Sequence, residues 1–140
     1  MRRSTNKRDT QIDEALVALF IGAMNANGHV SAHEAWRAHH LIWSTRRFRR
    51  RSGESIGRLI QRVRAGFERG GSTEFVAAAT ARIPPKLRQS AFAVIVDLLL
   101  DDGRIDPQER RFLRRLGSDL RLKPEVVRQV ISVMLLKNGL

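Results

Sequence analysis

The sequence predicts an all-α fold, a single compact domain of about seven helices. Apolar residues recur at helical spacing in successive segments, and no segment alternates polar and apolar residues as a half-buried strand does. Turns rich in glycine, proline or capping residues separate these segments. With 140 residues, of which 42% are hydrophobic, the chain is long enough to build one core.

The cysteine content and the net charge exclude some functions and favour others. There is no cysteine, which excludes disulfides and thiol catalysis. The formal net charge of +12 favours contact with polyanions such as nucleic acid, acidic lipid or acidic protein. We expect a cytoplasmic protein without a signal peptide or a membrane span, because the first apolar run is short and punctuated.

The N-terminal region is predicted to be a basic arm followed by a helix. Residues 1–8 are basic and polar, so we expect them to be disordered and the folded domain to cover residues 9–140. The first helix is expected over residues 10–26, with Asp9 or Thr10 as its N-cap.

Three helices follow in the first half of the chain. Ser31 and Glu34 have the spacing of a capping box, which predicts a second helix that ends near Arg50. The basic run at residues 46–51 closes it, since cations suit a helix C-terminus. Apolar and polar patterns then predict a third and a fourth helix, over residues 56–69 and 74–81.

The second half predicts three more helices. Residues 86–101, after Pro85, are apolar on nearly all sides, so we expect this helix to be central and buried. A sixth helix is expected over residues 107–120 and a seventh from residue 124 onward. The inner stripe of the seventh is predicted to be Val127, Val130, Ile131, Met134 and Leu135.

The chain contains an internal repeat. When Gly28 is aligned with Gly103, the apolar and acidic positions around the two glycines coincide. We therefore predict two pseudo-repeated helix–loop–helix hairpins, which pack through their first helices because neither can bury its apolar face alone. The predicted contacts are Leu16, Phe20, Phe92 and Ile95.

Acidic residues gather at the bend of the second hairpin, although the chain as a whole is basic. Asp102, Asp106 and Glu109 fall at the spacing of three ligand positions of an EF-hand calcium loop. Leu98 and Leu100 occupy two other ligand positions, which excludes a complete EF-hand. The alternative needs no metal: Gly103 ends one helix, and Asp106 and Glu109 form a capping box for the next.

The candidate metal ligands extend beyond these three residues. Asp97 and Asp101 lie one helical turn apart on the same face, and in the first hairpin Asn27 and Glu34 align with Asp102 and Glu109. A buried Asp97 needs an arginine, a hydrogen-bond donor or a metal, and an ion pair with an arginine is the simpler outcome.

At these motifs the chain resembles the TerB-like family of tellurite-resistance proteins. The resemblance rests on Asn-Gly-His-Val-Ser-x-x-Glu from residue 27, Asp-Gly-Arg-Ile-Asp-x-x-Glu from residue 102, and Ile-Pro-Pro-x-Leu-Arg from residue 83. It implies an all-helical domain, divalent-metal binding (Ca²⁺, Mg²⁺ or Zn²⁺) at the acidic loops, and a link to tellurite and stress resistance, often near membrane partners. The family's first motif usually has Asp-Gly, whereas Asn27 keeps an oxygen but loses the charge.

An alternative function uses the basic run. Arg46, Arg47, Arg49, Arg50 and Arg51 could contact phosphate groups, with Trp43 and Phe48 beside them. No nucleic-acid-binding motif accompanies these arginines, and the two aromatic residues fit the core stripe. A solvated face that contacts acidic partners or lipid is therefore favoured over a nucleic-acid site.

The sequence gives little support for a transition-metal site, a nucleotide site or a catalytic site. His29 and His33 are four residues apart, but no cysteine completes a transition-metal site. The chain has no nucleotide motif and no Ser/His/Asp pattern. We therefore expect a non-enzymatic, metal-responsive or partner-binding module, cytoplasmic or peripheral at the membrane, with a protein partner, weak self-association and no nucleic-acid ligand.

Overall fold

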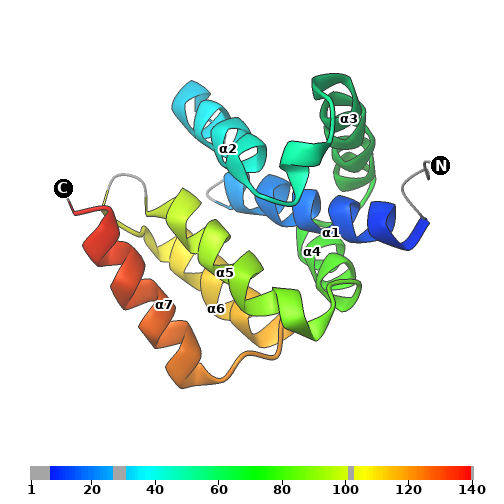
Figure 1. Cartoon of the computed structure of the whole chain (residues 1–140). Coiled ribbons are helices and arrows are strands. Elements are labelled where there is room, and N and C mark those ends of the chain that lie inside the picture. The colour runs from blue at the N-terminus through cyan, green and yellow to red at the C-terminus, as the bar shows by residue number, and fades with distance from the viewer. Residues whose placement is uncertain (1–6, 27–30, 101–102, 140) are drawn as a thin grey trace.

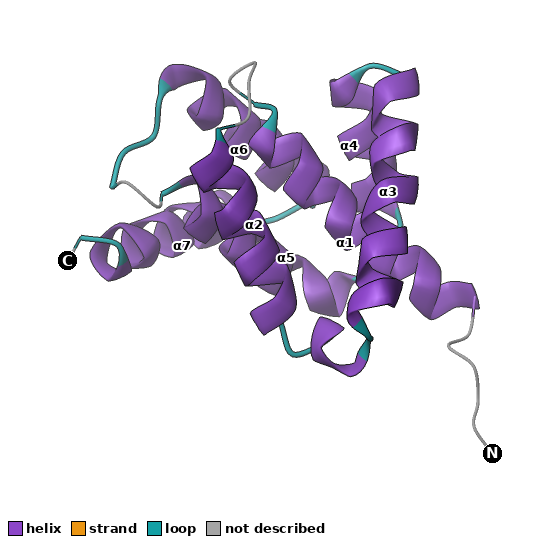
Figure 2. Ribbon diagram, turned by 90° about the horizontal axis from the view of Figure 1, so that it is seen from above, coloured by secondary structure: helices purple, strands orange, loops and turns teal. Residues whose placement is uncertain are grey.

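The computed structural model describes residues 7–26, 31–100 and 103–139. This part of the chain forms seven α-helices and one short 3-10 helix, without a strand (Figures 1 and 2). The elements are α1 (Lys7–Met24), α2 (Ala32–Ser44), η1 (Phe48–Arg50), α3 (Gly53–Arg69), α4 (Ser72–Ala81), α5 (Pro85–Leu99), α6 (Pro107–Asp119) and α7 (Pro124–Lys137). The predicted all-α fold is confirmed.

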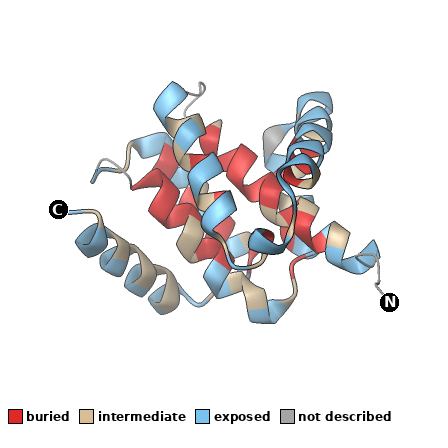
Figure 3. Ribbon diagram, turned by 45° about the horizontal axis from the view of Figure 1, so that its top comes forward, coloured by how far each residue is buried: buried red, intermediate tan, exposed pale blue. Residues whose placement is uncertain are grey.

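Helices α1 and α5 form the centre of the molecule. Helix α1 packs against α2, α3, α4 and α5, and α5 packs against α1, α2, α6 and α7. The residues coloured as buried in Figure 3 gather on these two helices. The C-terminal half of α1 is buried on every side, from Val17 to Met24, and so is α5 from Ile95 to Leu99. An apolar helix without a polar face is stable only in such a position.

The predicted contact between the first helices of the two hairpins is confirmed. Helices α1 and α5 pack together, and Phe20, Phe92 and Ile95 belong to one core cluster. Leu16 is only half-buried, since it lines a pocket beside this contact.

Three predicted boundaries are wrong, among them the start of the third helix, which begins at residue 53 rather than 56. The first helix begins at Lys7, so the last two residues of the predicted arm are helical. The second helix ends at Ser44 rather than near Arg50, because Thr45 turns into an extended conformation and Phe48 is drawn into the core at 1% exposure. The basic run therefore lies in the connection between two helices and not at a helix C-terminus.

Helix α7 lies at the edge of the molecule (Figure 1). It packs mainly against α5 and contributes partly buried residues, including Val127, Val130 and Met134, as predicted. Leu135 is 43% exposed, so its predicted place on the inner stripe is wrong. It stands only one residue after Met134, and a step of one residue carries it around the helix away from α5.

Candidate functional site

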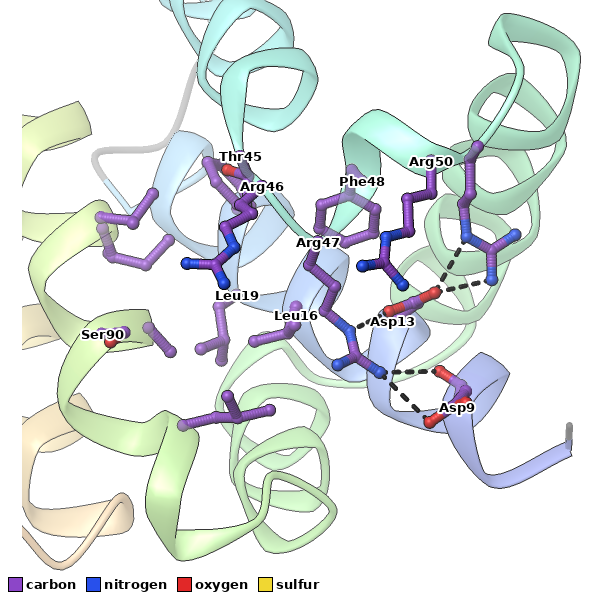
Figure 4. Close-up of a pocket in the computed structure, with 16 residues that line it drawn as sticks. Asp9, Asp13, Leu16, Leu19, Thr45, Arg46, Arg47, Phe48, Arg50 and Ser90 are labelled. Carbon is purple, nitrogen blue, oxygen red and sulfur yellow. Dashed lines mark hydrogen bonds and ion pairs between the residues drawn. The ribbon is translucent and has the colours of Figure 1, made fainter. Parts of the chain in front are cut away.

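A pocket of about 860 Å³ lies between α1, α5 and the connection of residues 45–52 (Figure 4). Its two sides differ in chemistry. The helices contribute mainly apolar side chains, namely Leu16, Leu19, Phe20, Leu87, Ala91, Val94 and Ile95. The connection contributes Arg46, Arg47, Arg50 and Arg51. We call this site the arginine pocket.

The local sequence explains why the arginines reach the pocket. Thr45 ends α2, and its hydroxyl donates a hydrogen bond to the Leu41 carbonyl over 2.6 Å. The buried Phe48 ring then anchors the short helix η1. This path directs four of the five predicted arginines to the pocket. Arg46, Arg49 and Arg50 are all exposed, but Arg49 does not line the pocket.

Asp13 of α1 holds two of the pocket arginines. Its side chain is only 7% exposed, and its Oδ1 accepts a hydrogen bond from Arg47 Nε. Its Oδ2 accepts from Arg51 Nε at 2.9 Å and from Arg51 Nη2 at 2.7 Å, which is a bidentate contact. Arg47 also lies 3.6 Å from Asp9, and Arg51 donates to the Ser55 hydroxyl. A buried carboxylate requires such partners, and together they fix the connection against α1.

The other two pocket arginines are not neutralised within the described part of the chain. The guanidinium groups of Arg46 and Arg50 make no ion pair or hydrogen bond with another described residue. Figure 4 shows Arg46 extending over Leu19 on the α5 side, and Arg50 on the α1 side near Asp13. Two aspartates therefore face four arginines, so the pocket lining has a formal charge of 4 − 2 = +2.

The acidic bend of the second hairpin forms the predicted capping box. Asp106 Oδ1 accepts from the Glu109 amide at 2.7 Å, and Glu109 Oε1 accepts from the Asp106 amide at 3.1 Å. Gly103 is left-handed, with a φ of 79°, as the predicted bend requires. Ser31 and Glu34 form the same box at the start of α2. Asp101, Asp102 and Asn27 lie outside the described residues.

Asp97 is held by cations and an amide, which confirms the predicted ion pair. Its carboxylate accepts from Arg37 Nη2 at 3.1 Å, from Lys137 Nζ at 3.0 Å and from Asn138 Nδ2 at 2.9 Å. Burial alone would raise the pKa of Asp97. The hydrogen bonds from Asn138 and Lys137 and the charges of Lys137 and Arg37 outweigh it, so the pKa lies below its ordinary value.

Metal ligands do not converge in the part of the chain that the structure describes. Over residues 7–26, 31–100 and 103–139, no group of three or more His, Asp or Glu side chains could hold a metal ion. Of the predicted ligands, Asp97, Asp106, Glu109 and Glu34 all have the protein partners given above. The structure thus brings together arginines around a pocket rather than carboxylates around a cation.

The comparison with protein families decides the relationship that the paired motifs suggested. The model of the family described as "Tellurite resistance protein TerB" matches residues 13–131. The chain belongs to the TerB family. The comparisons with curated proteins and with solved structures found no match. In this TerB domain, no helix among the described residues is long and apolar enough to cross a membrane.

The described histidines of the TerB domain, His33, His39 and His40, lie on the surface of α2. His40 stacks on Trp36 with ring centroids 5.2 Å apart, and His33 stacks on the other side at 6.3 Å. Trp36 is 60% exposed and Trp43 is 45% exposed. The prediction that Trp43 belongs to the core is therefore wrong, whereas it is confirmed for Phe48. His29 lies outside the described residues.

The sequence did not predict two parts of the arginine pocket, namely Asp13 and the apolar wall of α5. Asp13 was not among the predicted site residues. The available signal was that Leu16 and Val17 follow it by three and four residues and so share its helical face, since an acid on a buried face needs a basic partner. The apolar wall of α5, with Leu87 and Val94, carried no local signal, because the core and the pocket use the same residue types.

Proposed function

We propose that this TerB domain is a non-enzymatic interaction module in tellurite and stress resistance that binds an anionic partner in the arginine pocket. The observation that carries the proposal is the pair Arg46 and Arg50, two guanidinium groups without a protein partner among the described residues. A guanidinium presents paired N–H donors that match carboxylate and phosphate oxygens. Arg46 and Arg50 are exposed, so an anion can reach both guanidinium groups from solvent, and salt should weaken the contact.

The chemistry of the lining favours binding over catalysis. The residues that line the pocket include no histidine and no glutamate. Thr45 uses its hydroxyl to bond the Leu41 carbonyl, and Asp13 is engaged by two arginines. A nucleophile therefore has no neighbouring base to activate it. The proposed partners are acidic proteins and acidic membrane surfaces. The proposed location is the cytoplasm or the periphery of the membrane.

The experiment measures binding of inorganic phosphate and of heparin to the full chain, by calorimetry at several salt concentrations. Binding should weaken as salt rises, because phosphate contact is electrostatic. The double variant Arg46→Gln/Arg50→Gln should lose most of the affinity. Arg49→Gln removes the same charge from a neighbouring residue outside the pocket and should change it little. Equal losses in the two variants would indicate diffuse attraction to a basic protein and overturn the proposal.

A second candidate is a divalent-cation site at the acidic bend. The observation in its favour is the left-handed Gly103, whose amide donates to the Leu100 carbonyl at 2.9 Å, in a segment whose sequence carries five carboxylates. Ca²⁺ or Mg²⁺ would have to be held chiefly by Asp101 and Asp102, since Asp97 and Glu109 have other partners.

Melting of the chelator-treated protein tests this candidate. A cation that binds the folded state should raise the melting temperature, and Asp101→Asn with Asp102→Asn should abolish the rise. A melting temperature that does not respond to Ca²⁺, Mg²⁺, Zn²⁺ or Mn²⁺ at low salt would exclude it. Sedimentation of the same samples would test the expected weak self-association.

A further inference from the structure

We infer that the arginine pocket takes an amphipathic anion, a single hydrocarbon chain with a phosphate or carboxylate head group. The head group would contact Arg46 and Arg50, and the chain would lie along the apolar wall of α1 and α5. This inference rests on the proposed anion binding and adds a requirement for the hydrocarbon. Three features of the pocket support it, namely the apolar wall, the position of the charge and the size.

The apolar wall is accessible rather than closed. Leu16 of α1 and Leu87 and Val94 of α5 are half-buried, and each lines the pocket. Core side chains of these two helices, such as Phe92 at 0% exposure, show that neighbouring positions can be closed completely. Apolar surface left open inside a concavity gains free energy when a hydrocarbon covers it.

The charge of the pocket lies on one side. All four arginines come from the connection of residues 45–52, whereas the residues that α5 contributes are uncharged. Arg47 and Arg51 are paired with Asp13 and Asp9, which leaves Arg46 and Arg50 to carry the net charge. A ligand that matches this arrangement is anionic at one end and apolar along the rest.

The size of the pocket suits a small molecule. Its volume of about 860 Å³ falls in the range of ~300–1,000 Å³ that is usual for small-molecule sites. An inorganic anion would occupy only the arginine side and leave the wall in water. The chain's own residues 1–6 include Arg2 and Arg3 and no acidic residue, so their charge does not complement the site.

The experiment is a calorimetric titration of the full chain with octyl phosphate and decyl phosphate as monomers, below the concentrations at which they form micelles. Inorganic phosphate tests the head group alone, and decanol tests the chain alone. Each fully buried methylene strengthens binding about fourfold, so decyl phosphate should bind up to about fifteenfold tighter than octyl phosphate. Inorganic phosphate and decanol should both bind more weakly than either.

Variants separate the two halves of the ligand. Arg46→Gln/Arg50→Gln should weaken decyl phosphate at least about tenfold, and the exposed Arg49→Gln should leave it unchanged. Val94→Gln should reduce the advantage of decyl over octyl phosphate and spare the binding of inorganic phosphate. Ser90→Asp places a negative charge at an exposed lining position with little risk to folding, and it should also weaken decyl phosphate.

The outcomes distinguish this inference from the proposed function. One outcome is that inorganic phosphate binds through Arg46 and Arg50 with the same affinity as octyl phosphate and decyl phosphate. In that outcome the hydrocarbon requirement is wrong and anion binding stands. If neither phosphate nor alkyl phosphate binds, both are wrong. Binding to vesicles of phosphatidylcholine with phosphatidic acid, without binding of monomeric decyl phosphate, would place the contact at a membrane surface and overturn the inference.

Discussion

Lys137 at the end of α7 and Asp97 in α5 form an ion pair, with Nζ 3.0 Å from Oδ1. Arg37 of α2 and Asn138 donate to the same carboxylate, which therefore connects three helices. Asp97→Asn should lower the free energy of unfolding by about 1–3 kcal/mol, because the partly buried Arg37 loses the negative charge of this acceptor. Urea denaturation measures this. Lys137→Met, at a side chain that is 53% exposed, should cost no more than about 1 kcal/mol.

The same carboxylate predicts a pH dependence. The pKa of Asp97 is lowered in the folded state, so its contribution to stability is complete above the ordinary aspartate value of 3.8 and is lost as the pH falls through the lowered value. The difference in unfolding free energy between the parent and Asp97→Asn should shrink over that acid range. Denaturation curves at neutral and acid pH test this, and a difference that stays constant would contradict it.

The central position of α5 predicts a strong effect of a buried charge. Val96 is 0% exposed, and Val96→Asp would place a carboxylate there without a partner. We expect a loss of more than about 4 kcal/mol, a large share of the ~5–15 kcal/mol by which native domains are stable. Val133→Asp makes the same change on α7 at 57% exposure and should cost little. Thermal melts of the two variants that coincide would contradict the central place of α5.

Local signals in the sequence predicted much of this fold. The Asp106/Glu109 and Ser31/Glu34 boxes were identified from their spacing, since a capping box depends on residues only three apart. The end of α2 was not, because it depends on the burial of Phe48 by distant helices. The spacing of residues along a chain predicts local structure. It does not predict how one side chain packs against the rest of the fold.

The candidate site was predicted less well, for a related reason. The five arginines were identified from their run in the sequence. Which of them form ion pairs depends on Asp13, more than thirty residues away, which binds Arg47 and Arg51. The acidic residues were predicted as ligands because they are close in sequence. Asp97 instead contacts Arg37 and Lys137, which lie far from it along the chain.

A close approach between α1 and α4 predicts that Gly22 cannot be enlarged. A Cβ atom at Gly22 would lie 2.5 Å from Val76 Cγ2, and Val76 is itself buried. Gly22→Ala should therefore destabilise the domain by about 1–3 kcal/mol. Gly57 in α3 has no atom within 4 Å of the same position, so Gly57→Ala should stabilise it by about 0.5–1 kcal/mol. Thermal melts that move in the same direction for both variants would contradict this packing.

Asp13 predicts opposite changes in stability and in anion binding. Asp13→Asn removes the negative partner of Arg47 and Arg51, and we expect it to cost about 2–3 kcal/mol of unfolding free energy. The same change raises the positive charge of the arginine pocket, so the folded variant should bind inorganic phosphate more tightly than the parent. Asp9→Asn, at a side chain that is 52% exposed, is the matched control for the unfolding free energy and should change it little. Urea denaturation and phosphate titration measure the two effects on one sample. An Asp13→Asn protein that remains folded and binds phosphate more weakly would show that Asp13 organises the anion site, and that its charge does not compete with the ligand.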